Sequence, residues 1–188
     1  MKTLILVLGG VLLIVITMIA GLFLWARFSD GPKGPIAGGV LESGQFVNAT
    51  NADWEQILGD EPVVEIELQL ESSRTSRTTG AFTHDGHLYV PCDLGYVWRR
   101  LPGGVARAAL HTMWLLKDWH LKALEDGRVI ARIEGNRYKL QAVEVTDTRL
   151  LEIFRAHVSN AAAGVFELRD VQTDPEDIWF FRLDPREA

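Results

Sequence analysis

The fold of this chain is decided by a stretch in which every second residue is apolar, Val64-Glu65-Ile66-Glu67-Leu68-Gln69-Leu70-Glu71. Successive side chains of a β-strand point to opposite faces of a sheet, so this period of two predicts a strand with one face on a core and the other in water. The part of the chain around it is therefore expected to be built from strands.

Two hairpins follow along the chain. Residues 81–83 and 88–90 flank His84-Asp85-Gly86-His87, in which Asp-Gly supplies the positive φ angles of a tight turn. Residues 129–134 and 137–145 flank Gly135-Asn136, a turn dipeptide of the same kind. Residues 165–171 and 178–183 are two further strand candidates.

Helical spacing interrupts the strands. Residues 111–125 are expected to form one helix, with Gly127 at its C-terminus, and Asp147 is expected to cap a second helix over residues 148–158. A short helical turn capped by Asn51 is expected over residues 51–58. Antiparallel hairpins with two connecting helices predict a mainly β, α+β fold, an antiparallel split barrel of six to seven strands.

The N-terminus carries a different signal. Residues 3–26 contain no charge, and as a helix they would extend about 36 Å, enough for a hydrocarbon core of about 30 Å. A cleaved signal peptide is the alternative, but its apolar region is usually about 7 to 15 residues long and ends at small residues, whereas Arg27 and Phe28 follow Ala26 here. Residues 1–27 are therefore predicted to be a retained transmembrane anchor.

The flanks of this anchor bear on its orientation. Lys2 and the α-amino group balance Arg27 and Lys33 under the positive-inside rule. The very short N-terminal tail resembles a bacterial signal anchor, which predicts a single-pass protein of the inner (plasma) membrane with an external or periplasmic domain. Glycine and proline in residues 29–44 predict a linker, so residues 28–61 are taken as linker and helical turn, and residues 62–188 as the barrel domain.

Charge argues against two classes of general partner. The chain has a net charge of −6 at pH 7, and its first 27 residues hold two basic residues and no acidic one, so the remainder is more negative still. Such a surface repels nucleic acid and anionic lipid headgroups, so neither is expected as a general partner of the domain. Cys92 is the single cysteine, so no intrachain disulfide can form.

The order of motifs resembles a known family. Arg74-Thr75-Ser76-Arg77, the hairpin at 84–90, Lys117-Asp118-Trp119 and the stretch 125–147 are similar in order to the split β-barrel flavin and deazaflavin-binding superfamily, over about residues 62–147. This superfamily includes pyridoxamine-phosphate-oxidase-like proteins and deazaflavin-dependent nitroreductases. The resemblance implies a six-stranded Greek-key barrel, often a homodimer, with FMN or coenzyme F420 in a cleft. Residues 34–44 are similar to the linker of membrane-anchored members.

The resemblance also implies a cofactor site. Family enzymes hold cofactor phosphate with a turn of the form Gly-Arg-Lys-Ser-Gly, and residues 73–77 stand at that place here without its glycines and lysine. Arginine forks and hydroxyl donors suit a phosphate, although a solvated loop between strands has the same composition. The predicted cofactor-binding residues are Arg74, Thr75, Ser76, Arg77 and Trp119, and no catalytic residue is identified.

Other candidates have simpler explanations. His84, Asp85 and His87 could ligate a metal, but the hairpin turn accounts for them, and no metal is expected. Cys92 is either an activated nucleophile or a buried small hydrophobe. Two functions stay open: a membrane-anchored FMN- or F420-dependent oxidoreductase, and a noncatalytic binding or assembly module whose protein partner the sequence does not identify.

Overall fold

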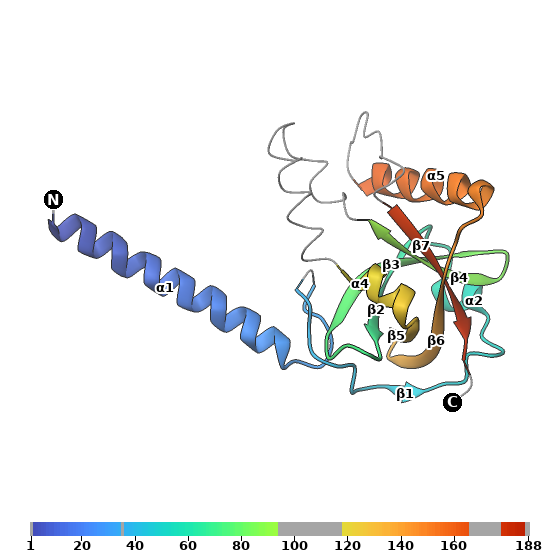
Figure 1. Cartoon of the computed structure of the whole chain (residues 1–188), viewed down its shortest axis with the longest axis horizontal. Helices are drawn as coiled ribbons and strands as arrows, with labels where there is room; N and C mark the ends of the chain where they lie inside the picture. Colours follow the sequence, from blue (N-terminus) through green and yellow to red (C-terminus); the bar gives the residue numbers. More distant parts are fainter. Residues whose placement is uncertain (1, 35, 94–117, 166–177, 187–188) are drawn as a thin grey trace.

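The structure is a computed structural model that describes residues 2–34, 36–93, 118–165 and 178–186. Within these residues the chain forms a closed antiparallel barrel of six strands, one extra strand and four helices (Figure 1). Most of the predicted strand at 165–171, and residues 111–117 of the predicted helix, lie outside the described residues. Val165 itself ends a helix.

Six strands close the barrel. Their order is β6-β5-β2-β3-β4-β7, and β7 pairs back onto β6. Each of these pairings is antiparallel, which confirms the predicted fold class. The strands are β2 (Val64–Leu70), β3 (Ser76–His84), β4 (His87–Asp93), β5 (Arg128–Ile133), β6 (Asn136–Glu144) and β7 (Ile178–Pro185).

One edge of β6 is shared between two partners. Its first two residues pair with the short parallel strand β1 (Gln45–Phe46), and residues 140–144 pair with β7. The barrel therefore closes through only part of β6, and β1 occupies the rest of that edge.

The two predicted hairpins are present. Asp85 and Gly86 have φ angles of 48° and 73°, as the first hairpin requires. In the second hairpin the positive φ angles belong to Glu134 (48°) and Gly135 (77°), so the predicted Gly135-Asn136 turn is wrong by one residue. The reason is the strand register, since Asn136 already pairs with Ile133 as the first residue of β6.

Alternate residues of every barrel strand fill its interior. Leu68 of β2, for example, lies opposite Ala131 on one side and Arg77 on the other, and Leu68 and Ala131 are buried. The helices α2 (Trp54–Leu58) and α4 (Trp119–Glu125) add Trp54 and Trp119 to the same core. The strands contribute Ile66, Leu68, Leu70, Ala81, Leu88, Val90, Cys92, Val129, Ala131, Ile133, Tyr138, Leu140, Ala142, Phe181 and Leu183.

Helix ends differ in detail from the prediction. The N-cap of α2 is Asp53 rather than Asn51, because the Asp53 carboxylate accepts a hydrogen bond from the Gln56 amide at 3.0 Å. Helix α4 ends at Glu125 and its C-cap is Asp126, so Gly127 directly follows the C-cap, where glycine is common. Asp147 caps α5 (Thr148–Val165) as predicted, accepting from the Leu150 amide at 3.0 Å, and α5 is longer than expected.

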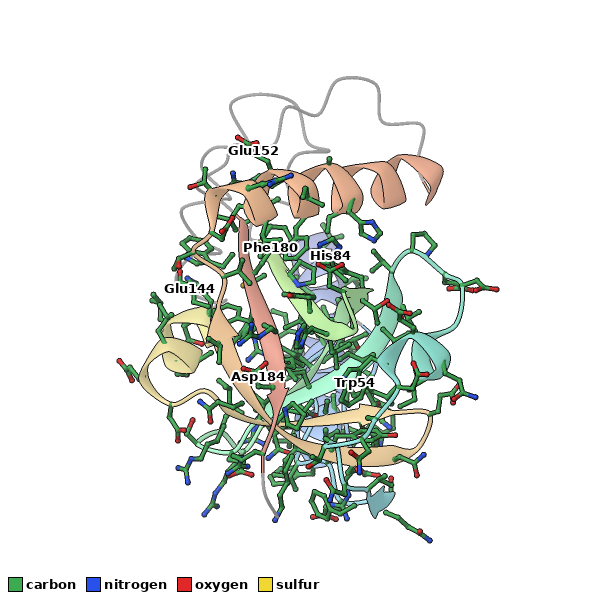
Figure 2. All side chains as sticks on the ribbon, turned by 90° about the vertical axis from the view of Figure 1, so that its right-hand side faces the viewer. Trp54, His84, Glu144, Glu152, Phe180 and Asp184 are labelled. Atoms are coloured by element: carbon green, nitrogen blue, oxygen red, sulfur yellow. The ribbon has the colours of Figure 1, made fainter. Side chains whose placement is uncertain are left out.

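A second apolar layer lies outside the barrel. Phe82, Tyr89 and Phe180 point outward from β3, β4 and β7, and Phe154 of α5 covers them. Figure 2 shows Phe180 beneath α5. Helix α5 therefore connects two strands, as predicted, and also packs on the outside of the barrel.

Helix α1 (Lys2–Arg27) extends away from the barrel as a single rod (Figure 1). Its part Val7–Arg27 is long and apolar enough to cross a membrane, judged by length and composition. The end of the rod is in contact with the rest of the chain, because Ala26 is fully buried and its carbonyl accepts a hydrogen bond from the Ser29 amide.

The glycine-rich residues 29–34 and 36–44, for which the sequence predicts a linker, are called the arm below. The arm lies on the outer face of β2, β3 and β5 and is hydrogen-bonded to it. The Gly38 amide donates to the Ser76 carbonyl at 3.0 Å, and the Leu41 amide donates to Gln69 Oε1 at 2.8 Å. Position 38 requires glycine because the backbone of Gly31 lies too close for any side chain. A Cβ at position 38 would lie 1.8 Å from the Gly31 carbonyl oxygen.

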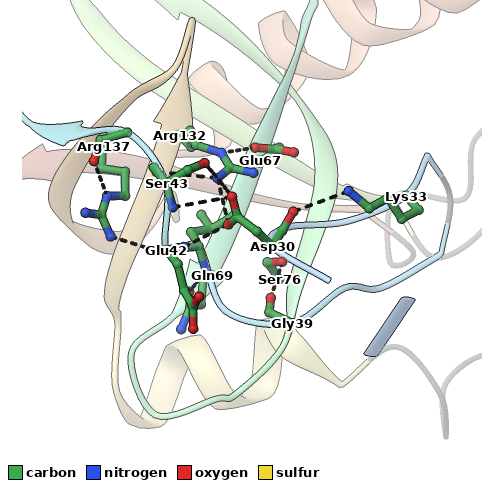
Figure 3. Close-up of polar contacts among 12 residues, drawn as sticks. Asp30, Lys33, Gly39, Glu42, Ser43, Glu67, Gln69, Ser76, Arg132 and Arg137 are labelled. Carbon is green, nitrogen blue, oxygen red and sulfur yellow. Dashed lines mark hydrogen bonds and ion pairs between the residues drawn. The ribbon is translucent and has the colours of Figure 1, made fainter. Parts of the chain in front are cut away.

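An ion-pair network fastens the arm. Arg132 of β5 lies between Glu67 of β2 and Asp30 of the arm, with its Nη1 2.9 Å from both Asp30 carboxylate oxygens (Figure 3). The same Nη1 donates to Ser43 Oγ at 2.7 Å. The Arg132 side chain is only 10% exposed, so water screens these contacts weakly.

The outer apolar layer yields the first prediction. Phe154→Ala should lower the free energy of unfolding by about 3–5 kcal/mol, because it leaves a cavity among aromatic rings. Ile153→Ala is the matched control, since Ile153 is 42% exposed, and it should cost less than about 1 kcal/mol. Urea unfolding of the full chain in detergent, followed by tryptophan fluorescence, measures both; equal losses would contradict the packing of α5 on the barrel.

The network yields a pH prediction. Partial burial acts to raise the pKa of Asp30, but hydrogen bonds from Ser43, the Glu42 amide and Arg132 outweigh it and hold that pKa well below its ordinary value. Stability from the Asp30 carboxylate is therefore complete above a pH of about 3.9 and is lost as the pH falls below it.

Asp30→Asn should accordingly melt at a lower temperature than the wild type at pH 7, and the gap should narrow at pH 3. Glu42→Gln removes an exposed carboxylate from the same arm and should change the melting temperature little at either pH. A gap between wild type and Asp30→Asn that is the same at both pH values would refute the network.

Candidate functional site

The predicted cluster at residues 74–77 is divided, because Arg74 and Thr75 precede β3 while Ser76 and Arg77 lie on opposite faces of it. Arg74 is exposed, and its carbonyl accepts a hydrogen bond from Arg27 Nη1 at 2.6 Å. Ser76 is fully buried beneath the arm, and its hydroxyl donates to the Gly39 carbonyl at 2.5 Å. Arg77 lies on the inner face, opposite Leu68, because neighbouring strand residues alternate.

Thr75 and Ser76 already donate their hydrogen bonds within the chain. The Ser76 amide donates to the Gly38 and Gly39 carbonyls at 3.2 and 3.1 Å. The hydroxyls of Thr75 and Ser73 share a hydrogen bond of 2.8 Å, and the Thr75 amide donates to Ser73 Oγ. A phosphate at residues 73–76 would have to displace these contacts.

The structure does bring two of the five predicted site residues together. The guanidinium carbon of Arg77 lies 5.6 Å from the centroid of the Trp119 ring, within the range of a cation–π contact. Trp119 is only 1% exposed, and its ring also packs on Phe181 at 5.2 Å. Trp119 therefore positions Arg77 and offers almost no free surface to a flat ligand.

Burial and charge act in opposite directions on Arg77. Burial lowers its pKa below the ordinary value, while Cys92 and Asp118 act to raise it. The pKa of Asp118 is lowered, chiefly by its hydrogen bond with Lys122 and also by the charge of Arg77. Asp118 is thus ionised at neutral pH, and Arg77 remains a cation because guanidinium pKa values start so high.

Sequence reasoning did not connect several residues at this end of the barrel. Cys92 of β4 lies opposite Trp179 of β7 in the strand register, and the Trp179 ring lies 4.5 Å from the ring of His120 on α4. Cys92 and His120 are both buried, which supports the small-hydrophobe interpretation of Cys92 over an exposed nucleophile. The β4–β7 pairing joins distant segments, so only the alternation within residues 178–183 could have indicated it.

The histidines of the first hairpin are explained by the turn. His84 and His87 pair across it, and His84 Nε2 lies 3.6 Å from the carboxylate of Asp85. The His84 ring also packs edge-on against Phe154 at 5.2 Å. Among the described residues, no group of three or more His, Cys, Asp or Glu side chains is arranged to hold a metal ion.

The geometry defines the class of this domain as a split barrel, and the strand pairings that close it carry that assignment. A scan of family models and a search of curated proteins find no match to the chain.

Among solved structures, a candidate pyridoxamine 5'-phosphate oxidase from Listeria innocua is 15% identical, with a TM-score of 0.44 over 70% of this chain and 90% of that one. An FAD-binding protein from Mesorhizobium loti is 13% identical, with a TM-score of 0.40 over 72% of this chain and 88% of that one.

Proposed function

We propose that this protein is a single-pass membrane protein whose split barrel binds a flavin or deazaflavin cofactor and acts as an oxidoreductase. The apolar helix α1 supports the anchor, and the closed barrel supports the cofactor class through the family that the motif order resembles. The barrel is proposed to stand on the external or periplasmic side of the inner (plasma) membrane, as a homodimer in the manner of the family.

The observation that carries the cofactor proposal is Arg77 on its Trp119 platform. Arg77 is a partly exposed cation on the inner face of the barrel wall, and a guanidinium is well suited to a phosphate or carboxylate group. FMN and coenzyme F420 both carry such anionic groups. Of the five residues predicted to bind the cofactor, Arg77 fits this role and Trp119 orients it. Arg74 and Thr75 fit less well because they lie in the loop before β3, and Ser76 because it is on the opposite face of the strand.

A second function has its own support. The arm already accepts hydrogen bonds from both the amide and the hydroxyl of Ser76, where the family implies a phosphate. A barrel whose phosphate site has been replaced by its own chain would serve as a noncatalytic binding or assembly module at the membrane surface. Specific protein partners and no bound cofactor are the expected properties of such a module.

An absorption spectrum and a mass spectrum of the gently purified full chain separate the two proposals. A redox protein should carry a flavin-type chromophore or bind added FMN, FAD or F420 saturably. A colourless protein that ignores all three at high micromolar concentration would refute the oxidoreductase and favour the module.

If a cofactor binds, Arg77→Gln should weaken its affinity by about ten- to a hundredfold, since a charged hydrogen bond contributes roughly 1.5–3 kcal/mol. Arg74→Gln is the matched control, because it removes the same charge three residues away on a different face, and it should leave affinity within about twofold. Fluorescence titration measures both, and circular dichroism checks that both variants are folded. Equal losses, or a loss confined to Arg74→Gln, would reject Arg77 as the cofactor contact.

A further inference from the structure

The end of α1 exposes two aromatic residues beside its last apolar turn. Trp25 is 59% exposed and Phe28 is 82% exposed. Trp and Tyr side chains concentrate at the level of lipid headgroups, because they combine an apolar ring with a polar atom. Trp25 therefore marks the level at which the proposed anchor leaves the bilayer, and Phe28 adds apolar surface next to it.

Three cations gather around this point. Arg27 Nη1 donates to the Arg74 carbonyl at 2.6 Å, and Lys33 Nζ lies 5.9 Å from the centroid of the Trp25 ring. All three basic residues are exposed. We call Trp25, Arg27, Phe28, Lys33 and Arg74 the collar.

The collar is positive on a chain that is negative as a whole. The net charge is −6 at pH 7, and the nearest acidic residue in sequence, Asp30, has its carboxylate turned to Arg132 of the barrel. Arg74 joins the collar only through folding, because the arm fixes the loop before β3 next to the end of the helix. A search for basic residues close in sequence to the apolar helix would identify only Arg27 and Lys33.

We propose that the collar binds the phosphate groups of anionic lipid headgroups and so seats the barrel on the membrane surface. This inference rests on the proposed membrane anchor. The collar is continuous with the apolar helix, and guanidinium and ammonium groups complement lipid phosphate in charge and hydrogen bonding. In this proposal Arg74 binds lipid phosphate, whereas in the cofactor proposal Arg77 binds the cofactor, so the two proposals depend on different residues.

Native mass spectrometry of the full chain in detergent tests the collar, with phosphatidylglycerol and phosphatidylcholine titrated separately. The wild type should retain phosphatidylglycerol in preference to phosphatidylcholine. Lys33→Gln and Arg74→Gln should each weaken phosphatidylglycerol binding by about fivefold, the effect of one cation near a lipid surface. Arg149→Gln, which removes an exposed cation from α5, is the matched control and should change binding little.

Three results would overturn the collar: equal binding of the two lipids, an equal effect of Arg149→Gln, or displacement of phosphatidylglycerol by FMN or inorganic phosphate at the same concentration. Extraction of native membranes with alkaline carbonate separates this failure from that of the anchor. A chain released by carbonate would refute the anchor and the collar together. A chain that stays in the membrane but binds both lipids equally would refute the collar alone.

Discussion

Arg132 joins the two parts of this molecule. It holds a carboxylate of the barrel, Glu67, and a carboxylate of the arm, Asp30, and so binds the chain that leaves α1 to the outer face of β2 and β5. Breaking such a partly buried pair leaves an uncompensated charge, which costs more than the pair itself contributes. The position of the helix end, the burial of Ser76 and the placing of Arg74 beside Arg27 all depend on the arm that Arg132 fastens.

The arm also decides how the functional candidates are distributed. Ser76 and Arg77 lie on opposite faces of β3, because neighbouring side chains of a strand alternate. The arm covers the face that carries Ser76, so Ser76 is buried. At the barrel end, Arg77 lies against the buried indole of Trp119. Arg74 lies in the loop before β3, beside the end of α1. A cluster that is continuous in sequence is thus divided between two parts of the surface.

Much of the fold follows from local pattern. The alternation in β2 and the Asp85-Gly86 turn predicted the strand and the first hairpin because both depend on neighbouring residues alone. The contacts of the arm could not be predicted in this way. Gly38 allows two backbone segments to lie close together, and composition alone does not distinguish such a glycine from one in a flexible linker. The division of residues 74–77 required the exact start of β3, and the contact of Cys92 with Trp179 required a long-range strand pairing.

Hydrogen exchange of the full chain in lipid nanodiscs tests most directly whether the barrel is fastened to its anchor. The amides of Gly31, Gly38, Gly39 and Leu41 all donate hydrogen bonds within the arm or to the barrel, so peptides covering residues 29–41 should exchange about as slowly as those covering β2. Exchange of these peptides at the rate of an unstructured chain, with β2 still protected, would show a free linker and would contradict the account.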